Sequence, residues 1–253
     1  MADDDRYRRM KTHATADEVD AYRALAALLA SSPVPSSEIL ANLSLYLTRS
    51  SLSQILFMSH LYSKIVDVHG VVIEFGNRWG RNLALFSSLR NIFEPHNYSR
   101  RIIGFDTFEG FPSIAVKDGS GPATKVGALA VAPNYQDHLN ELLEIHQRLS
   151  PRPDLRRFET IKGDVEETLP RYLETHPETI VALAYFDMDL YGPTKAALKA
   201  ILPCLTKGSI VGFDELGLVE FPGESTALKE VLDLSEHAVV RTPYSNHQSY
   251  VVM

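Results

Sequence analysis

From about residue 70 to its end, the chain alternates short apolar runs with amphipathic stretches. VVIEFG at 71–76 and IVALAYFDMD at 180–189 are short and rich in Val, Ile, Phe and Tyr, which is typical of buried strands. NLALFSSLRNIF at 82–93 and TKAALKAILPCL at 194–205 instead repeat their apolar residues at helical spacing. Strands that alternate with helices predict an α/β fold, in which a mostly parallel sheet carries helices on both faces.

The same pattern assigns the other elements of this region. Further strands are expected at RIIGFD, FETIKGD and GSIVGFDE, and a helix at TALKEVLDL. HAVVR and HQSYVVM, separated by TPYSN, predict a closing hairpin with one antiparallel strand. The middle segment at about 113–135 is rich in Gly, Pro, Ala and Ser and is too long for an ordinary connection. Such loops are often lids, so we expect it to order over a bound ligand and to shape one side of the site.

Before residue 70 the pattern is helical. Thr15 and Glu18 form a capping box ahead of an Ala- and Leu-rich run, which ends at the turn-like SSPVPSS. A second helix is expected over 53–66, where apolar residues recur at helical spacing. We therefore predict an N-terminal helical cap over residues 1–69 and a main domain over 70–253. The amphipathic helices of the cap are suited to packing on a second copy, which leaves a homo-oligomer open.

Acidic residues follow the predicted strands. Because ligands bind outside the carboxyl ends of the strands in such a sheet, these acids are expected to share a site. Alternation along a strand points both acids of the DMD sequence the same way. Ionised carboxylates are costly to bury unpaired and repel one another, which indicates a cation between them; the alternative is a set of solvated caps and turn residues. The acids concerned are Glu74, Asp106, Asp164, Asp187, Asp189, Asp214 and Glu215.

The first strand runs into a glycine-containing turn, EFGNRWG. Gly76 and Gly80 permit a tight turn and a close approach of the backbone to a ligand, although an ordinary strand-to-helix turn would use them too. Asp106 follows the second strand, where a dinucleotide-type site has a carboxylate for ribose hydroxyls. Asp106 and Asp164 are equally suited to capping a turn or a helix. Trp79 either lies beside the ligand or packs in the core.

Composition narrows the classes of ligand. The 253 residues carry a formal net charge of −7, which argues against a nucleic-acid binder, because phosphate binding needs clustered Lys and Arg. One cysteine, Cys204, excludes an intrachain disulfide and fits a reducing cytoplasm. With no apolar signal segment or bilayer-length apolar run, we expect a soluble, cytoplasmic protein without a membrane partner. The histidines lack metal-ligand spacing, and only His138, near the middle segment, is a candidate base.

The order of E-x-G-x-x-x-G, GFDTFEGFP, KGD, FDMDLYGPT and GFDE resembles the class I S-adenosylmethionine-dependent methyltransferases. Within them it is most similar to the macrocin- and mycinamicin-type sugar O-methyltransferases of natural-product pathways, over about residues 52–214. The resemblance implies a Rossmann-like sheet of seven strands and a cofactor-binding methyltransferase domain over 70–253. It also implies contacts to the methionine moiety from Glu74, Gly76 and Gly80, to the ribose from Asp106, Thr107 and Phe108, and to the adenine from Asp164 and Val165.

Members of this family use a divalent ion, usually Mg²⁺, which the resemblance assigns to Asp187, Asp214 and Glu215. The family usually has two aspartates at the last two of these positions, so Glu215 is a departure. Magnesium prefers oxygen ligands, and a sugar diol chelated by it would be oriented and made more acidic. A neighbouring carboxylate, Asp189 or Asp187, would then accept the hydroxyl proton as general base.

Together these observations predict an enzyme, an S-adenosylmethionine-dependent O-methyltransferase. Its expected acceptor is a hydroxylated small molecule such as a natural-product sugar, with assistance from magnesium; methylation at nitrogen stays open. One alternative is a nicotinamide-dependent oxidoreductase, which shares the glycine turn and the ribose acid, although this turn lacks G-x-G-x-x-G. Another is a non-catalytic scaffold that binds the cofactor with the same fold.

Overall fold

The chain folds into two compact units in a computed structural model that describes residues 15–121, 123–245 and 247–253. The smaller unit is Met1–Gln54 and the larger is Ile55–Met253. Residues 55–69, which we expected in an N-terminal cap over 1–69, thus belong to the larger unit by their contacts. Residues 1–14 of that expected cap, and residue 122 of the expected lid, lie outside the described residues.

The smaller unit is helical, as its pattern predicts. Helix α2 spans Ala16–Ala30 and begins with the capping box, in which Thr15 Oγ1 accepts from the Glu18 N–H and Glu18 Oε2 accepts from the Thr15 N–H. A short 3₁₀ helix, η1, follows at Leu43–Tyr46, and α3 begins at Arg49 and continues into the larger unit as far as Lys64. The two helices expected before residue 70 are therefore confirmed.

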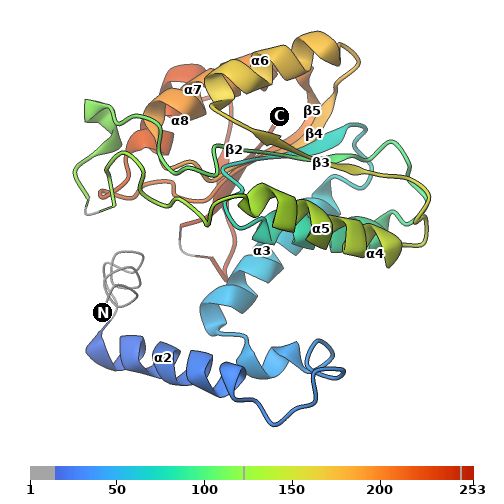
Figure 1. The fold of residues 1–253 in the computed structure, drawn as a ribbon. Helices are drawn as coiled ribbons and strands as arrows, with labels where there is room; N and C mark the ends of the chain where they lie inside the picture. Colours follow the sequence, from blue (N-terminus) through green and yellow to red (C-terminus); the bar gives the residue numbers. More distant parts are fainter. Residues whose placement is uncertain (1–14, 122, 246) are drawn as a thin grey trace. The chain divides into compact units, whose positions relative to one another are not determined.

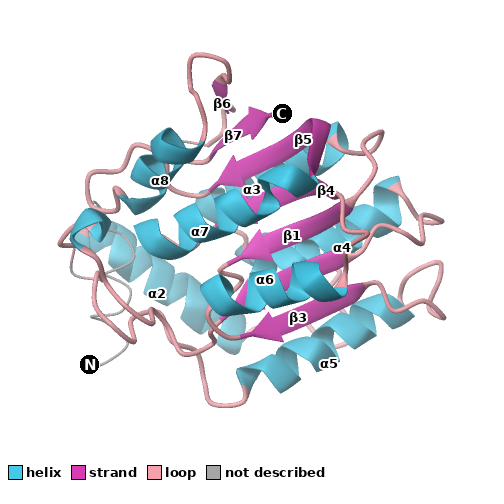
Figure 2. Cartoon of the chain, turned by 90° about the horizontal axis from the view of Figure 1, so that it is seen from above, coloured by secondary structure: helices cyan, strands magenta, loops and turns pink. Residues whose placement is uncertain are grey.

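The larger unit is built on a sheet of seven strands in the order β3-β2-β1-β4-β5-β7-β6. Strands β1 to β5 pair in parallel, whereas β7 runs antiparallel to both β5 and β6 (Figure 2). This is the mostly parallel sheet with a closing antiparallel strand that the sequence predicts. The strands are β1 Val71–Phe75, β2 Ile102–Asp106, β3 Phe158–Lys162, β4 Val181–Phe186, β5 Leu205–Phe213, β6 Val239–Arg241 and β7 Ser249–Val252.

Helices cover both faces of this sheet. The part of α3 in this unit lies with α4 and α5 on one face, and α6, α7 and α8 lie on the other (Figures 1 and 2). None of the helices in the described part of the chain combines the length and apolar character needed to cross a membrane. The helices are α4 Arg81–Phe93, α5 Tyr135–Arg148, α6 Val165–Thr175, α7 Tyr191–Ile201 and α8 Gly223–Val231, with 3₁₀ turns η2 Val116–Asp118 and η3 Leu202–Cys204.

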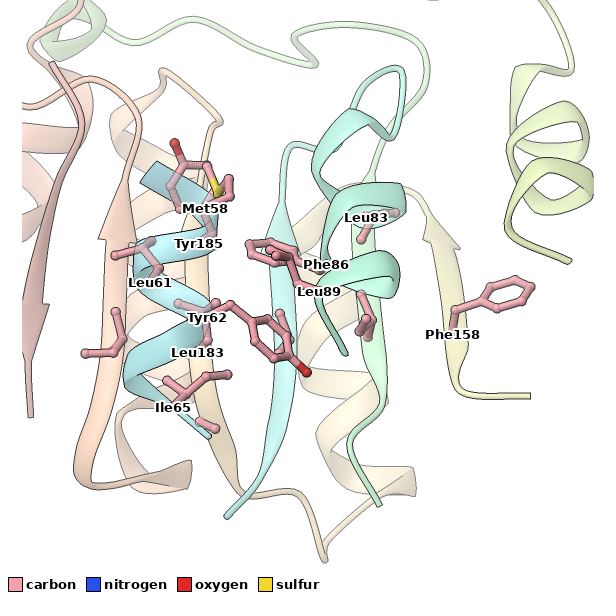
Figure 3. Close-up of a cluster of buried hydrophobic side chains, with 14 of the residues drawn as sticks. Met58, Leu61, Tyr62, Ile65, Leu83, Phe86, Leu89, Phe158, Leu183 and Tyr185 are labelled. Carbon is pink, nitrogen blue, oxygen red and sulfur yellow. The ribbon is translucent and has the colours of Figure 1, made fainter. Parts of the chain in front are cut away.

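The core consists of one apolar layer on each side of the sheet. Strand β4 is buried along its whole length and alternates its side chains between the layers, with Leu183 and Tyr185 on one side and Ala184 and Phe186 on the other. Figure 3 shows the first layer, in which apolar side chains of α3 and α4 pack against Leu183 and Tyr185. Because burial of apolar area is the main stabilising term, these layers hold the strand ends in fixed register.

A buried ion pair lies at the amino ends of the strands, opposite the end that carries the acids. Arg100 Nε donates to Glu94 Oε2 at 2.9 Å, and the Tyr62 hydroxyl donates to the same oxygen at 2.7 Å. The Arg100 guanidinium also donates to the carbonyls of Ile65, Val68 and Gly70. Burial opposes ionisation of Glu94, but the hydrogen bonds from Arg100 and Tyr62 outweigh it and hold the pKa of Glu94 below its usual value.

We predict that Glu94→Ala lowers the free energy of unfolding by about 3 kcal/mol or more at neutral pH, because it leaves the Arg100 charge buried without its partner. Urea denaturation measures the change. The matched control is Asp154→Ala, which removes an exposed partner of Arg152 and should leave the midpoint close to that of the wild type. Equal midpoints for the two variants would contradict the prediction. In the wild type, the stabilisation by Glu94 should be lost as the pH falls through its lowered pKa.

Candidate active site

The ends of β1, β4 and β5, which carry five of the seven predicted acids, lie side by side in the sheet. Strand β4 pairs with both β1 and β5, and Phe75, Phe186 and Phe213 are aligned across the three strands. The residues that follow them, Gly76, Asp187 and Asp214, therefore leave the sheet at one level. The order of the strands reverses between β1 and β4, which is where α/β sheets bind their ligands.

The two glycines of the first turn are required by contacts within the protein. A Cβ on Gly76 would lie 2.0 Å from the carbonyl oxygen of Asp187, and its φ of 86° is in the left-handed region. A Cβ on Gly80, whose φ is 71°, would lie 2.2 Å from Leu139 Cδ1 of α5. Gly76 thus lets β1 and the end of β4 meet, and Gly80 lets α4 start against α5.

Glu74 is a buried carboxylate that has a hydrogen bond from the described part of the chain to only one of its two oxygens. Its side chain is 1% exposed, and Oε1 accepts from Asn82 Nδ2 at 2.8 Å. Among the described residues, Glu74 Oε2 and both polar atoms of the Asn77 side chain are buried without a hydrogen-bond partner. Burial raises the pKa of Glu74 to about 7, against the opposing hydrogen bond from Asn82. An ammonium group of a ligand would satisfy Glu74 Oε2 and Asn77 Oδ1 by donating to them, whereas Asn77 Nδ2 would itself donate to an acceptor such as a ligand carboxylate.

Asp106 ties the end of β2 to the glycine turn. Its Oδ2 accepts from the Arg78 N–H at 2.7 Å, and its Oδ1 accepts from the Phe108 N–H at 2.5 Å as an Asx turn does. Burial raises the pKa of Asp106, while the two N–H donors favour its charged form. The Phe108 side chain packs in the core, and Thr107 Oγ1 donates to the Gly110 carbonyl. The turn role and a ribose role are compatible, because each carboxylate oxygen accepts more than one hydrogen bond.

The loop after β4 is held by two buried carboxylates outside the predicted set. Glu224, on the first turn of α8, is 0% exposed; its Oε1 lies 3.2 Å from the Met188 nitrogen and 3.4 Å from the Asp189 nitrogen. Its Oε2 accepts from the Glu215 N–H at 3.3 Å. Asp118 of the middle segment accepts from the Tyr191 N–H through Oδ1 at 2.6 Å. Glu224 therefore bridges the two loops that carry the DMD and DE acids.

The acids in this cluster cannot all be charged at neutral pH. Burial, together with the nearby Asp214 and Asp189 charges, raises the pKa of Asp187 well above its usual range. Burial and the Asp214 charge raise the pKa of Asp189 to about 7, and burial with the Asp189 and Asp214 charges raises that of Glu215 to about 9. The interaction between the Asp189 and Glu215 side chains favours the charged form of Asp189 and the protonated form of Glu215.

Asp214 is oriented by its own partners. The Tyr185 hydroxyl donates to Asp214 Oδ1 at 2.5 Å, and Gln248 Nε2 donates to the same oxygen at 2.8 Å. Gln248 is itself fixed by the Ser245 hydroxyl, which donates to its Oε1 at 2.9 Å. Burial, with the Asp214 charge, raises the pKa of Tyr185 well above its ordinary value, which keeps the hydroxyl a donor.

The predicted metal ligands meet at this rim but are not arranged around one point. Within the described ranges, no three His, Cys, Asp or Glu side chains converge in a way that could hold a metal ion. Asp214 is engaged by Tyr185 and Gln248, and Glu215 by Asp189. The chemistry of the donor set still fits a hard cation, because the atoms are all carboxylate oxygens and Glu215 Oε2 is buried with no hydrogen-bond partner among the described residues.

The remaining predicted residues lie further from the cluster. Asp164 follows β3 at the edge of the sheet and caps α6, accepting from the Glu166 N–H at 2.9 Å, while Val165 is buried in the core. Trp79 is 39% exposed and packs edge-on against Tyr135, so it is not a core residue. His138 lies on the exposed part of α5, 5.6 Å from the Tyr135 ring between centroids.

The expected lid segment packs beside the DMD loop. Ala128 of this segment and Phe111, just before it, form a small apolar cluster with Leu190, and Asp118 accepts a hydrogen bond from the Tyr191 N–H. Sequence reasoning missed Asp118, as it did Asn77, Glu224 and Gln248. Each is a single polar residue at a position where polar residues are ordinary, and only its burial, at 7% exposure or less, distinguishes it.

Two solved structures of a calicheamicin methyltransferase are similar to this chain over nearly its whole length. CalS11, a calicheamicin methyltransferase, is 44% identical with a TM-score of 0.92, over 95% of this chain and 94% of that chain. An apo structure of CalS11, described as a TDP-rhamnose 3′-O-methyltransferase of calicheamicin biosynthesis, is 40% identical with a TM-score of 0.84, over 95% and 96%. The O-methyltransferase NovP, at 20% identity, a TM-score of 0.59 and 79% of each chain, supports the fold alone. No protein-family model and no curated protein matches the chain.

The fold is that of a class I S-adenosylmethionine-dependent methyltransferase. The chain belongs to this class, in the family of natural-product sugar O-methyltransferases that includes CalS11. It is therefore an enzyme that uses S-adenosylmethionine, and the nicotinamide-dependent alternative is not supported.

We predict that Glu74→Gln changes how stability depends on pH. Because the folded pKa of Glu74, about 7, lies above its usual value of 4.5, ionising it opposes folding, and wild-type stability is lost as pH rises through 7. The variant keeps the hydrogen bond from Asn82 but cannot ionise. Urea unfolding should show it gaining up to about 3 kcal/mol on the wild type between about pH 5 and pH 9. Parallel pH curves for the two proteins would refute this.

Proposed function

We propose that the protein transfers a methyl group from S-adenosylmethionine to a hydroxyl of a sugar, carried either by a nucleotide or by a natural product. The observation that carries this proposal is the 40–44% identity, over nearly the whole chain, to a calicheamicin methyltransferase described as acting on TDP-rhamnose. The buried acids at the strand ends support it, because a hydroxyl acceptor needs a base and an electrostatically negative site suits a sulfonium donor.

The donor would lie along the ends of β1, β2 and β3. The unsatisfied Glu74 Oε2 and the Asn77 amide suit the amino acid moiety, next to the turn of Gly76 and Gly80. Asp106 would accept from the ribose hydroxyls, with Thr107 and Phe108 beside it. Asp164 and Val165 would border the adenine, at the end of β3.

The acceptor would enter over the DMD loop, on the side where the segment at 113–135 packs. We infer that this segment acts as a lid, since Asp118 and the cluster around Leu190 join it to the loop that carries Asp189. In the reaction, the acceptor oxygen forms a bond to the methyl carbon, and the carbon–sulfur bond breaks with its electron pair passing to sulfur. The hydroxyl proton passes to Asp189.

Asp189 is the better candidate for the base of the two acids first considered. Its raised pKa, about 7, is close to a neutral working pH, and it is 7% exposed, so that water is largely excluded from it. Its hydrogen bond with Glu215 fixes the direction of the carboxylate. Asp187, directly after β4, would instead be one of the acids that hold the cation.

Magnesium would be held by Asp187, Asp214 and Glu215. Bound there, the ion would supply a Lewis acid that orients two sugar hydroxyls and lowers their pKa. The support for it is the electrostatics of the rim, because the like charges of Asp187, Asp189, Asp214 and Glu215 oppose one another without a cation.

We predict that Asp189→Asn lowers kcat at least about 100-fold with TDP-rhamnose as the acceptor, because the carboxylate that takes the proton is lost. Formation of S-adenosylhomocysteine measures the rate, and calorimetry should show unchanged affinity for S-adenosylhomocysteine. The control is Asp67→Asn. Asp67 is exposed and lies just before β1, at the amino ends of the strands and away from the candidate site. Near-wild-type kcat in Asp189→Asn would refute the base role, and a wild type that binds the donor but transfers to no sugar would favour the scaffold alternative.

Chelation tests the metal. We predict that dialysis against EDTA abolishes transfer and that Mg²⁺ restores it, because the bound ion would orient the diol and lower the pKa of its hydroxyls. Glu215→Gln should raise the concentration of Mg²⁺ needed for half-maximal rate about tenfold or more, whereas Glu215→Asp, which keeps the carboxylate, should shift it less. Full activity in excess EDTA would exclude the proposed metal.

A further inference from the structure

Two loops that are distant in the sequence donate backbone N–H groups to a single side chain. Met188 and Asp189, after β4, face Glu224 Oε1 at 3.2 and 3.4 Å, and Glu215, after β5, donates to Oε2 at 3.3 Å. Glu224 is completely buried and belongs to α8, not to either loop. One carboxylate thus spans the gap between the pair Asp187–Asp189 and the pair Asp214–Glu215.

The position of Glu224 is built for this contact. Its neighbour Gly223 is the first residue of α8, and a Cβ there would lie 2.5 Å from the Asp189 carbonyl oxygen and 2.6 Å from the Tyr191 nitrogen. Only glycine lets the helix approach the loop this closely. A carboxylate in the first turn is also favoured by the helix dipole, which offsets part of the cost of burial. Burial and the Asp189 and Asp214 charges raise the pKa of Glu224 to about 8, while the backbone donors favour its charged form.

The loop that Glu224 holds is strained. Asp189 has φ of 62°, in the left-handed region, and the Leu190 N–H donates to the Met188 carbonyl at 2.7 Å, so the chain reverses sharply at the candidate base. Non-glycine residues keep such conformations only where the surroundings impose them. The surroundings here are Glu224 on one side and Asp118, which binds the Tyr191 nitrogen, on the other.

We propose that Glu224 is a positioning residue that fixes the DMD loop against the DE loop and so sets the distance between the base and the acids opposite it. The inference rests on the proposed function, because its effect on rate requires Asp189 to act as the base. No role in contacting donor or acceptor is assigned to Glu224. Its action is through the backbone of Met188, Asp189 and Glu215.

The direct test is hydrogen exchange at these three amides, which needs no knowledge of the acceptor. Glu224→Gln keeps the shape of the side chain but has one acceptor oxygen, so one loop keeps its hydrogen bond and the other loses it. We expect exchange at least tenfold faster than wild type at either Glu215 or the Met188–Asp189 pair, and at both in Glu224→Ala. The control, Glu236→Gln, changes an exposed glutamate beyond α8 and should leave all three amides unchanged.

Kinetics separate positioning from general damage. Glu224→Gln should lower kcat at least tenfold while KM for S-adenosylmethionine, affinity for S-adenosylhomocysteine and the melting temperature stay near wild type. Wild-type exchange at all three amides with wild-type kcat would overturn the proposal, and so would a fall in kcat matched by equal losses of donor affinity and melting temperature. Failure of the proposed function would look different: Asp189→Asn would keep its rate, while exchange at the amides would still respond to Glu224→Gln.

Discussion

The mutual repulsion of buried carboxylates at the ends of β1, β4 and β5 is the constraint on which the site depends. Register across these strands gives Glu74, Asp187 and Asp214 no freedom to separate, since the strands that carry them are buried on both faces. Burial first, and then the charges of neighbouring acids, raise the pKa values of Glu74, Asp187, Asp189 and Glu215. A folded protein tolerates this arrangement only if protons or a bound cation neutralise part of it.

Because these acids repel one another, the side chains and loops that carry them are held by hydrogen bonds to neighbouring residues. Tyr185 and Gln248 orient Asp214, and the backbone around Asp189 is held by Glu224 and Asp118. Without such partners, like-charged side chains would turn away from one another toward solvent. Positioned groups in a water-excluded site are also what methyl transfer needs, because the acceptor oxygen must lie in line with the carbon–sulfur bond. The free-energy cost of burying these like-charged groups together therefore arises at the site where the proposed reaction needs them.

Much of this fold follows from local pattern. Short apolar runs that end in acids predicted β1 to β5 and their common edge, and the capping box at Thr15 predicted the start of α2. Helix α5 was not predicted, although Leu139 and Leu143 are buried four residues apart, because most of its other residues are polar and its further apolar residues Leu142 and Ile145 are exposed. The sequence predicted a boundary between residues 69 and 70, whereas the structure divides the chain after Gln54, because apolar side chains of α3 are part of the core of the larger unit.

The site, like the fold, has some residues that the sequence predicts and others that only the structure reveals. Acids at strand ends are visible in the sequence, since topology alone brings them together. The sequence suggested that Gly76 and Gly80 make room for a ligand. In the structure, a Cβ at Gly76 would collide with Asp187 and one at Gly80 with Leu139, and no local pattern encodes these contacts. Glu224 lies outside every motif, and its importance comes from tertiary burial. Which carboxylate keeps a proton likewise depends on distances between chain-distant loops.

Calorimetric titration of Mg²⁺ into the complex with S-adenosylhomocysteine, in buffers of different ionisation enthalpy near pH 7.5, tests the central claim most directly. If the acids share protons because they repel one another, binding of the cation should release about one proton or more, chiefly from Glu215, whose pKa is raised to about 9. A heat of binding that is the same in every buffer, or no binding at all, would contradict the account.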